Sequence, residues 1–186
     1  MIASISTVAT GVFSILFSKS TLVAKPGKTS NSSIYEIDLK LNNGEFISLS
    51  KFKGKKLMFV NVASRCGYTS QYKKLQQLYE EKNDVLEIIA IPCNDFGRQE
   101  PGSAKTIKEF CELNYSITFT IADKQQIKSN TTSQLYKWLS DPDLNGWNDR
   151  LPSWNFCKYL INENGELTHF FKSSVNPVGK KILPLI

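Results

Sequence analysis

Hydrophobic and polar positions along the chain predict short strands and helices in alternation. Apolar residues at alternating positions on both sides of Asn42-Asn43-Gly44 predict a hairpin closed by a type I′ turn. Continuous apolar runs over 57–62 and 85–91 predict two buried parallel strands. Between them, apolar residues at helical spacing predict a helix over 71–82, which completes a right-handed β-α-β unit.

The second half of the chain continues this alternation. The pattern predicts a helix over 103–114 capped by Ser103, a short strand near 118–121, a helix over 133–140, a loop over 141–152, a hairpin of 156–161 with 167–171, and a final helix opened by Pro177. Together these elements predict an α/β protein with a thioredoxin-like fold, in which helices flank a central mixed sheet and a β-hairpin precedes it.

The first 33 residues differ from the rest of the chain. Residues 1–18 carry no charge and 8–17 are mostly apolar, which favours a secretory signal cut after Ala24. No Lys or Arg precedes the apolar run and Leu22 is a poor residue three back from that cut, which favours a plain N-terminal extension. The protein is exported, to the periplasm or by secretion, on the first interpretation and cytoplasmic on the second.

Two further features of this N-terminal region bear on domain organisation. The apolar run is shorter than the roughly 20 residues that span a bilayer, so no stable membrane span is expected. Residues 25–33 are rich in Lys, Ser and Gly and are typical of a linker. We therefore expect residues 1–33 to form an extension and 34–186 to form the folded domain.

Composition and charge narrow the function. The 186 residues, 41% hydrophobic and 22% charged, are typical of one soluble globular domain. The net charge of +6 comes from 23 basic residues scattered among 17 acidic ones, with no basic block interleaved with aromatics. Nucleic acid is therefore not an expected partner.

Four cysteines are the most informative residues: Cys66, Cys93, Cys111 and Cys157. They include no Cys-x-x-Cys pair, and His169 is the single histidine, so neither a zinc site nor a dense disulfide scaffold is expected. The remaining interpretation is that one or two of these cysteines carry out thiol chemistry and that the others are small buried hydrophobic residues.

Cys66 has the most favourable position for such chemistry. It lies between the strand predicted over 57–62 and the helix predicted over 71–82, beside Arg65 and Gly67. Ligands of open α/β sheets bind beyond the carboxyl ends of the strands, and a helix N-terminus stabilises a thiolate. A buried structural thiol is the alternative interpretation.

Three segments resemble signatures of one enzyme family. Residues 61–69, Asn-Val-Ala-Ser-Arg-Cys-Gly-Tyr-Thr, resemble the active-site segment of the glutathione peroxidases, in the version with cysteine where some members have selenocysteine. Residues 92–102, Pro-Cys-Asn-Asp-Phe-Gly-Arg-Gln-Glu-Pro-Gly, are similar to the second signature of the family, and Trp154-Asn155-Phe156 to the third. The resemblance extends from about Ile34 to the C-terminus.

The resemblance implies a catalytic group made of Cys66, Gln99, Trp154 and Asn155. The Cys66 thiolate would attack one oxygen of the peroxide bond. The side-chain N–H groups of the other three would stabilise the thiolate and the charge that develops on the leaving oxygen. No metal and no cofactor are expected.

The resemblance also bears on how the oxidised enzyme is recycled. Cys111, in Glu109-Phe110-Cys111, matches the resolving cysteine of thioredoxin-dependent members, whereas Cys93 and Cys157 are expected to be packing residues. Cys111 shares a helix face with Ile107 and Phe110, so its helix would have to unwind locally before a disulfide with Cys66 could form.

The expected function is a monomeric thiol peroxidase that reduces hydrogen peroxide and organic hydroperoxides through a sulfenic acid and is recycled by thioredoxin. Direct use of glutathione is one alternative, and a redox sensor or relay protein is another.

The family pattern is interrupted at Asp95, where glutamine is common, and over 120–130, where a proline and a Val-Asn-Gly run are absent. The connection over 140–153 lacks the insertion of tetrameric, glutathione-using members, which favours the monomer.

Overall fold

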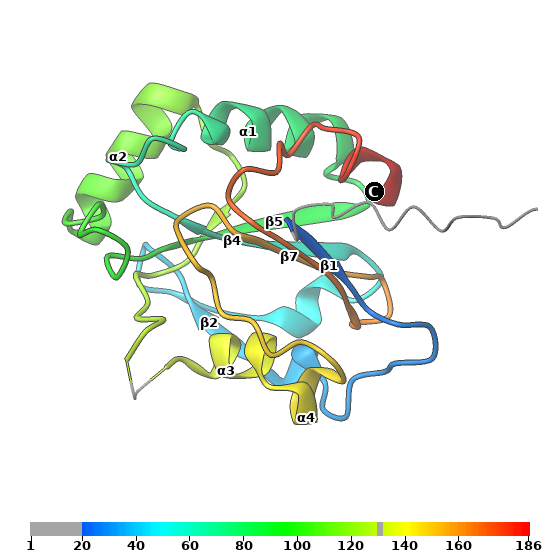
Figure 1. The fold of residues 1–186 in the computed structure, drawn as a ribbon. Helices are drawn as coiled ribbons and strands as arrows, with labels where there is room; N and C mark the ends of the chain where they lie inside the picture. The colour runs from blue at the N-terminus through cyan, green and yellow to red at the C-terminus, as the bar shows by residue number, and fades with distance from the viewer. Residues whose placement is uncertain (1–19, 130–131) are drawn as a thin grey trace, which may run out of the picture.

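A six-stranded mixed sheet forms the centre of the computed structural model, which describes residues 20–129 and 132–186 (Figure 1). The strand order is β1-β8-β7-β4-β5-β6. Strands β4, β5 and β6 are parallel, whereas β7 pairs antiparallel with β4, β8 with β7, and β1 with β8. The strands span Thr21–Val23 (β1), Lys56–Val62 (β4), Leu86–Pro92 (β5), Thr120–Ile121 (β6), Lys158–Ile161 (β7) and Leu167–Phe171 (β8).

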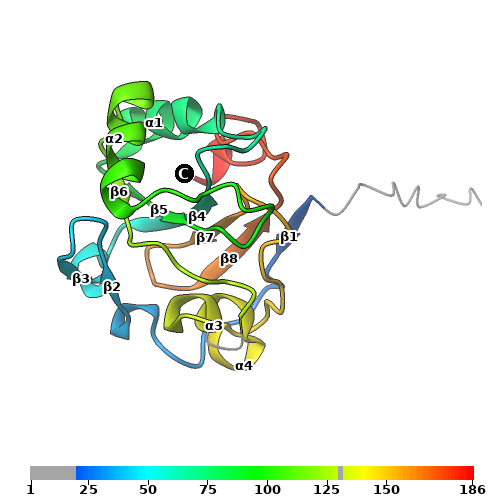
Figure 2. The ribbon, with the colours of Figure 1, turned by 90° about the vertical axis from the view of Figure 1, so that its left-hand side faces the viewer.

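Helices cover both faces of this sheet, as Figures 1 and 2 show. On one face lie α1 (Gln71–Lys82) and α2 (Ala104–Tyr115), with the C-terminal segment beside them. The opposite face carries α3 (Gln134–Ser140), α4 (Pro142–Asn145) and the hairpin of β2 (Asp38–Lys40) and β3 (Phe46–Ser48). The predicted central mixed sheet with flanking helices and a preceding hairpin is confirmed.

The core divides into two layers because side chains of a strand alternate between its faces. In β4, Met58 and Val60 point to the α1 and α2 side, whereas Leu57 and Phe59 point to the α3 side. All four are fully buried, as expected for a central strand covered on both faces.

The predicted type I′ turn of the first hairpin is wrong. The Gly44 N–H donates to the Leu41 carbonyl at 2.9 Å, but positive φ occurs only at Gly44, at 90°, and not at Asn42 or Asn43. This is a type I turn followed by a left-handed glycine, the usual three-residue hairpin loop. Asn-Asn-Gly is compatible with both turns, so the sequence does not distinguish them.

The predicted C-terminal helix is also wrong. After Pro177 the chain forms turns and a 3₁₀ segment at Leu183–Leu185. Pro184 supplies no N–H and its ring would clash with the preceding turn of an α-helix, so a regular helix is disfavoured here. In the predicted loop over 141–152 the short helix α4 appears, started by the Asp141 side chain, which accepts from the Asp143 N–H at 2.9 Å.

Part of the predicted N-terminal extension joins the sheet. Strand β1 pairs with β8, and Leu22 packs against the core of the α3 face. Residues 1–19, which hold most of the predicted signal sequence, lie outside the described residues. Within 20–129 and 132–186, none of the helices has the length and apolar character that crossing a membrane requires.

Candidate active site

Cys66 lies in the short loop between β4 and α1, as predicted. Its backbone N–H donates to Thr69 Oγ1 at 3.0 Å, and that hydroxyl donates to the Ala63 carbonyl at 2.8 Å, so the loop is held in a tight turn. The Tyr68 N–H donates to Cys66 Sγ at 3.4 Å. The side chain is 8% exposed. A backbone N–H aimed at sulfur stabilises the thiolate, which is the nucleophilic form of cysteine.

Gln99 and Asn155 are in direct contact, although 56 residues separate them. Asn155 Nδ2 donates to Gln99 Oε1 at 3.0 Å and to the Phe96 carbonyl at 3.3 Å. The Gln99 carbonyl oxygen is therefore occupied, and its NH₂ group remains available as a donor. The Arg65 N–H donates to the Gln99 backbone carbonyl at 3.0 Å, which ties this pair to the segment that carries Cys66.

Trp154 is brought to the same end of the sheet by Asn61. Asn61 Nδ2 donates to the Trp154 carbonyl at 2.9 Å, and the Asn61 carbonyl accepts from the Phe156 N–H at 2.6 Å. The Trp154 ring lies edge-on to Phe96 with centroids 6.3 Å apart and is 38% exposed, so it borders solvent. Sequence analysis did not assign this structural role to Asn61, because the contact joins residues 93 positions apart.

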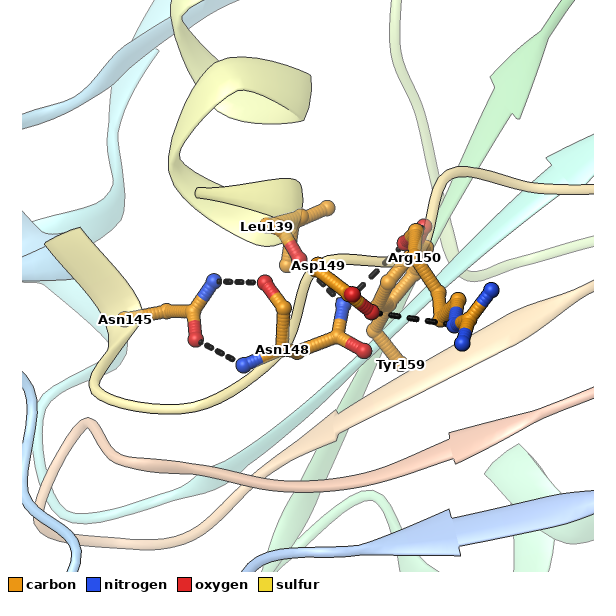
Figure 3. Close-up of polar contacts among 6 residues, drawn as sticks. All are labelled: Leu139, Asn145, Asn148, Asp149, Arg150 and Tyr159. Carbon is orange, nitrogen blue, oxygen red and sulfur yellow. Dashed lines mark hydrogen bonds and ion pairs between the residues drawn. The ribbon is translucent and has the colours of Figure 1, made fainter. Parts of the chain in front are cut away.

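Two buried asparagines hold the loop that leads to Trp154 (Figure 3). The Asn145 side chain bonds both the N–H and the carbonyl of Asn148, at 2.7 and 2.9 Å. Asn148 Nδ2 in turn donates to the carbonyls of Leu139 and Arg150, and the Tyr159 hydroxyl donates to the Arg150 carbonyl at 2.7 Å. The loop is thus fixed to α3 and β7, which limits the freedom of the segment that follows, with Trp154 and Asn155.

The four cysteines are free thiols that lie on different faces of the sheet. Cys66 and Cys111 belong to the core on the α1 and α2 side, whereas Cys93 and Cys157 belong to the core on the α3 side. Burial raises the pKa of Cys111 to about 11 and that of Cys93 to about 12. Both thiols are therefore protonated at neutral pH while they stay buried.

Asp95, which interrupts the family pattern, has a clear structural role. Its Oδ2 accepts the backbone N–H groups of Ile127 and Lys128 at 2.6 and 2.9 Å. The Lys128 ammonium also lies 4.4 Å from the centroid of the Phe96 ring. The carboxylate thus anchors the segment after β6 beside the active-site loop.

This geometry defines a class of protein before any comparison is made. A thiol follows a central parallel strand at the N-terminal end of a helix, and polar side chains from two distant loops converge on the same end of the sheet. In the described part of the chain, no three His, Cys, Asp or Glu side chains are grouped as a metal site requires. The class is a thioredoxin-like protein with a thiol at the junction of a central strand and a helix.

Comparisons with known proteins identify the family. The glutathione peroxidase family profile matches residues 34–140. Glutathione peroxidase-like peroxiredoxin 2 of Saccharomyces cerevisiae is 39% identical over 78% of this chain and 91% of the yeast protein. The glutathione peroxidase homolog BsaA of Bacillus subtilis is 38% identical, with the same coverage. The chain therefore belongs to the glutathione peroxidase family and is a peroxidase, an antioxidant oxidoreductase.

Solved structures agree with this assignment. The crystal structure of T. cruzi GPX1 is 30% identical and aligns with a TM-score of 0.62 over 83% of this chain and 96% of that protein. A DsbF homologue from Corynebacterium diphtheriae, 16% identical, aligns with a TM-score of 0.64 over 99% of this chain and all of its own. The second likeness shows the fold alone, and the thioredoxin-like fold predicted from the sequence is confirmed.

Proposed function

We propose that this peroxidase reduces hydrogen peroxide and organic hydroperoxides through Cys66 and is recycled by thioredoxin through a Cys66–Cys111 disulfide. The main observation that supports this disulfide is that, of the other three thiols, only Cys111 lies on the same face of the sheet as Cys66. Cys93 and Cys157 belong to the core on the opposite face of the sheet. The yeast relative is named a peroxiredoxin, which agrees with thiol-based chemistry.

The first step uses the thiolate of Cys66. Its sulfur attacks one peroxide oxygen, the O–O bond breaks, and the departing oxygen takes up a proton to leave as water or an alcohol. Gln99 and Trp154 are proposed to stabilise the charge on the sulfur and on the leaving oxygen as N–H donors. Asn155 is proposed to take part in the catalytic group by holding Gln99, since both of its side-chain N–H groups are engaged by Gln99 Oε1 and the Phe96 carbonyl. The hydrogen bond between Gln99 and Asn155 supports this grouping, because it occupies the Gln99 carbonyl oxygen as an acceptor and leaves the Gln99 NH₂ group free to donate.

The second step requires α2 to open. Cys111 is fully buried in the second half of α2, and we propose that the last two turns of the helix unwind to bring its sulfur to Cys66. The Cys111 sulfur then attacks the Cys66 sulfenic acid, the S–O bond breaks, and water leaves. Two thiols of reduced thioredoxin return both cysteines to the thiol form.

The test is peroxide-dependent turnover with thioredoxin and, in parallel, with glutathione. We expect Cys66→Ser to lose activity with both reductants. Cys111→Ser is expected to consume one equivalent of peroxide but to lose turnover with thioredoxin, whereas the control Cys93→Ala keeps it. Full thioredoxin-dependent turnover by Cys111→Ser would contradict the proposal, and activity with glutathione alone would support the glutathione-dependent alternative. Slow turnover with a trapped mixed disulfide to another protein would favour the redox relay.

We further propose that the active unit is a monomer with one peroxidase domain. The short connection between α3 and β7 supports this proposal. Light scattering coupled to gel filtration should give a mass near the 21.0 kDa of the single chain, and a tetramer would contradict the proposal.

A further inference from the structure

Glu100 is a buried carboxyl group with no counter-charge bonded to it. Its side chain is fully buried, and Oε1 accepts from the Ser64 hydroxyl at 2.7 Å. The other oxygen, Oε2, is buried and has no hydrogen-bond partner. Among residues 20–129 and 132–186, none of the salt bridges reaches Glu100. Acidic residues are almost never fully buried unless they are paired with a positive charge, so a functional reason for the burial of Glu100 is worth seeking.

One side of Glu100 contacts the segment that carries the peroxide-reactive thiol. Ser64, which donates to Oε1, lies two residues before Cys66. The neighbouring pair Arg65 and Gln99 is joined through the backbone at 3.0 Å, so the two segments run side by side. The carboxyl group is therefore held next to the loop where the Cys66 sulfenic acid forms.

Glu100 also lies near the proposed resolving thiol. Cys111 of α2 and Tyr72 of α1 are fully buried, and burial is the main reason that the pKa of each is raised. The charge of Glu100 adds to both shifts, so its carboxyl group lies near these two side chains. The Tyr72 hydroxyl and the Cys111 thiol lie close enough to shift each other's pKa, and the Tyr72 hydroxyl, like Glu100 Oε2, is buried without a hydrogen-bond partner. Glu100 precedes α2 by four residues, so it stays at the base of that helix when the later turns open.

Resolution needs such a group, because a thiol that stays protonated is a poor nucleophile. We propose that Glu100 carries the proton of the resolving step, taking it from the Cys111 thiol and giving it to the hydroxide that leaves Cys66. In this step the S–H bond of Cys111 and the S–O bond of Cys66 break, and the S–S bond and one water molecule form. The carboxylate is regenerated. This inference rests on the proposed function of Cys111.

The surroundings of Glu100 suit a proton carrier. Burial raises the pKa of the carboxyl above its usual range, whereas Ser64, Lys124 and Arg65 act in the opposite direction and are outweighed. Tyr72 of α1 and Cys111 of α2 are the titratable groups of the two helices on which its charge acts. A carboxyl group whose pKa is closer to neutral pH is better suited both to accept and to donate a proton than an exposed carboxyl group with an ordinary pKa.

The experiment measures the two steps separately after one equivalent of hydrogen peroxide. Peroxide consumption reports the first step, and acid-quenched samples analysed by mass report the Cys66–Cys111 disulfide. In Glu100→Gln we expect disulfide formation to slow at least about tenfold more than peroxide consumption does, as for loss of a general acid–base group. The matched control is Glu112→Gln, which removes an exposed carboxylate that also raises the pKa of Cys111. Both of its steps should stay within about twofold of the wild type, well below the effect of a general acid–base group.

The pH profile separates proton transfer from a structural effect. The wild-type rate of disulfide formation should fall at acid pH, and Glu100→Gln should lack this acidic limb. Ser64→Ala, which removes a hydrogen bond that favours the carboxylate, should move the limb to higher pH and tests the proposal even if Glu100→Gln does not fold. Equal rates in wild type and Glu100→Gln, or an unmoved limb in Ser64→Ala, would overturn this inference alone. A wild type that forms no disulfide would overturn the proposed function with it.

Discussion

Asn155 Nδ2 donates a hydrogen bond to Gln99 Oε1 at 3.0 Å, which makes two residues from different signature segments one unit. Because Asn155 is fully buried and also bonds the Phe96 carbonyl, it determines which end of the Gln99 amide is free. The proposed role of Gln99 as a donor therefore depends on Asn155.

From this pair we predict a shared catalytic effect. Asn155→Ala and Gln99→Ala should each lower the rate of Cys66 oxidation by about 10²-fold, the usual effect of losing one charge-stabilising donor. The double variant should be little worse than either single one, because residues that act as a unit are not additive. Rapid-mixing measurement of peroxide consumption tests this, with the exposed Asn164→Ala as the control. Fully additive losses would show that the two side chains act independently.

A second prediction concerns Lys158, a fully buried ammonium group below α1. Its Nζ donates to Gln71 Oε1 and to the Val175 carbonyl, and burial lowers its pKa to about 7. The unfolded chain holds this proton up to a pH near 10.4, so between these values the unfolded state binds more protons and stability rises with pH. In Lys158→Met this contribution is absent.

The free energy of unfolding of the wild type, minus that of Lys158→Met, should therefore increase from pH 7 to pH 9. The limiting slope is about 1.4 kcal/mol per pH unit. Urea titrations at several pH values measure it, and the exposed Lys51→Met should show no such trend. A difference that stays constant or falls with pH would mean that Lys158 keeps an ordinary pKa.

A third prediction tests the anchoring role of Asp95. Asp95→Ala leaves the N–H groups of Ile127 and Lys128 without their acceptor, so unfolding should become easier by about 1–3 kcal/mol. Asp95→Asn keeps one acceptor oxygen and should lose less. Chemical denaturation compares both with Asp84→Ala, an exposed aspartate, as the control. If Asp95→Ala and the wild type had the same free energy of unfolding, the anchoring role of Asp95 would be contradicted.

A fourth prediction concerns β1, the edge strand contributed by the N-terminal region. Thr21 to Val23 pair with β8, the Lys172 N–H donates to the Ser20 carbonyl at 2.8 Å, and Leu22 packs on the core. A chain that starts at residue 25, as after a cut behind Ala24, would lose these contacts and expose β8 as an edge.

We expect this shortened chain to melt at a lower temperature and to aggregate more readily than a chain starting at residue 20. Thermal unfolding followed by circular dichroism and light scattering makes the comparison. Identical melting curves would show that β1 adds nothing to the stability of the sheet.

Local patterns predicted the elements best where each had its own strong signal. The helix over 71–82 and the strand over 167–171 have the predicted bounds, because their apolar spacing is set within a few residues. The prediction of a final helix was wrong because Pro184 disfavours a regular α-helix in this segment. The predicted type of the first turn was wrong because Asn-Asn-Gly allows two backbone geometries, and only the complete hairpin selects one of them.

For the active site, the sequence by itself determined the fold class, the position of Cys66 between a strand and a helix, and the family resemblance. Only the tertiary structure decided which residues meet across long separations: Gln99 with Asn155, Asn61 with Trp154, and Glu100 with Ser64. It also decided that Cys111 shares a sheet face with Cys66 and that the Glu100 carboxyl is buried. The physical reason is that burial and distant pairing come from the packing of whole elements, which local spacing does not encode.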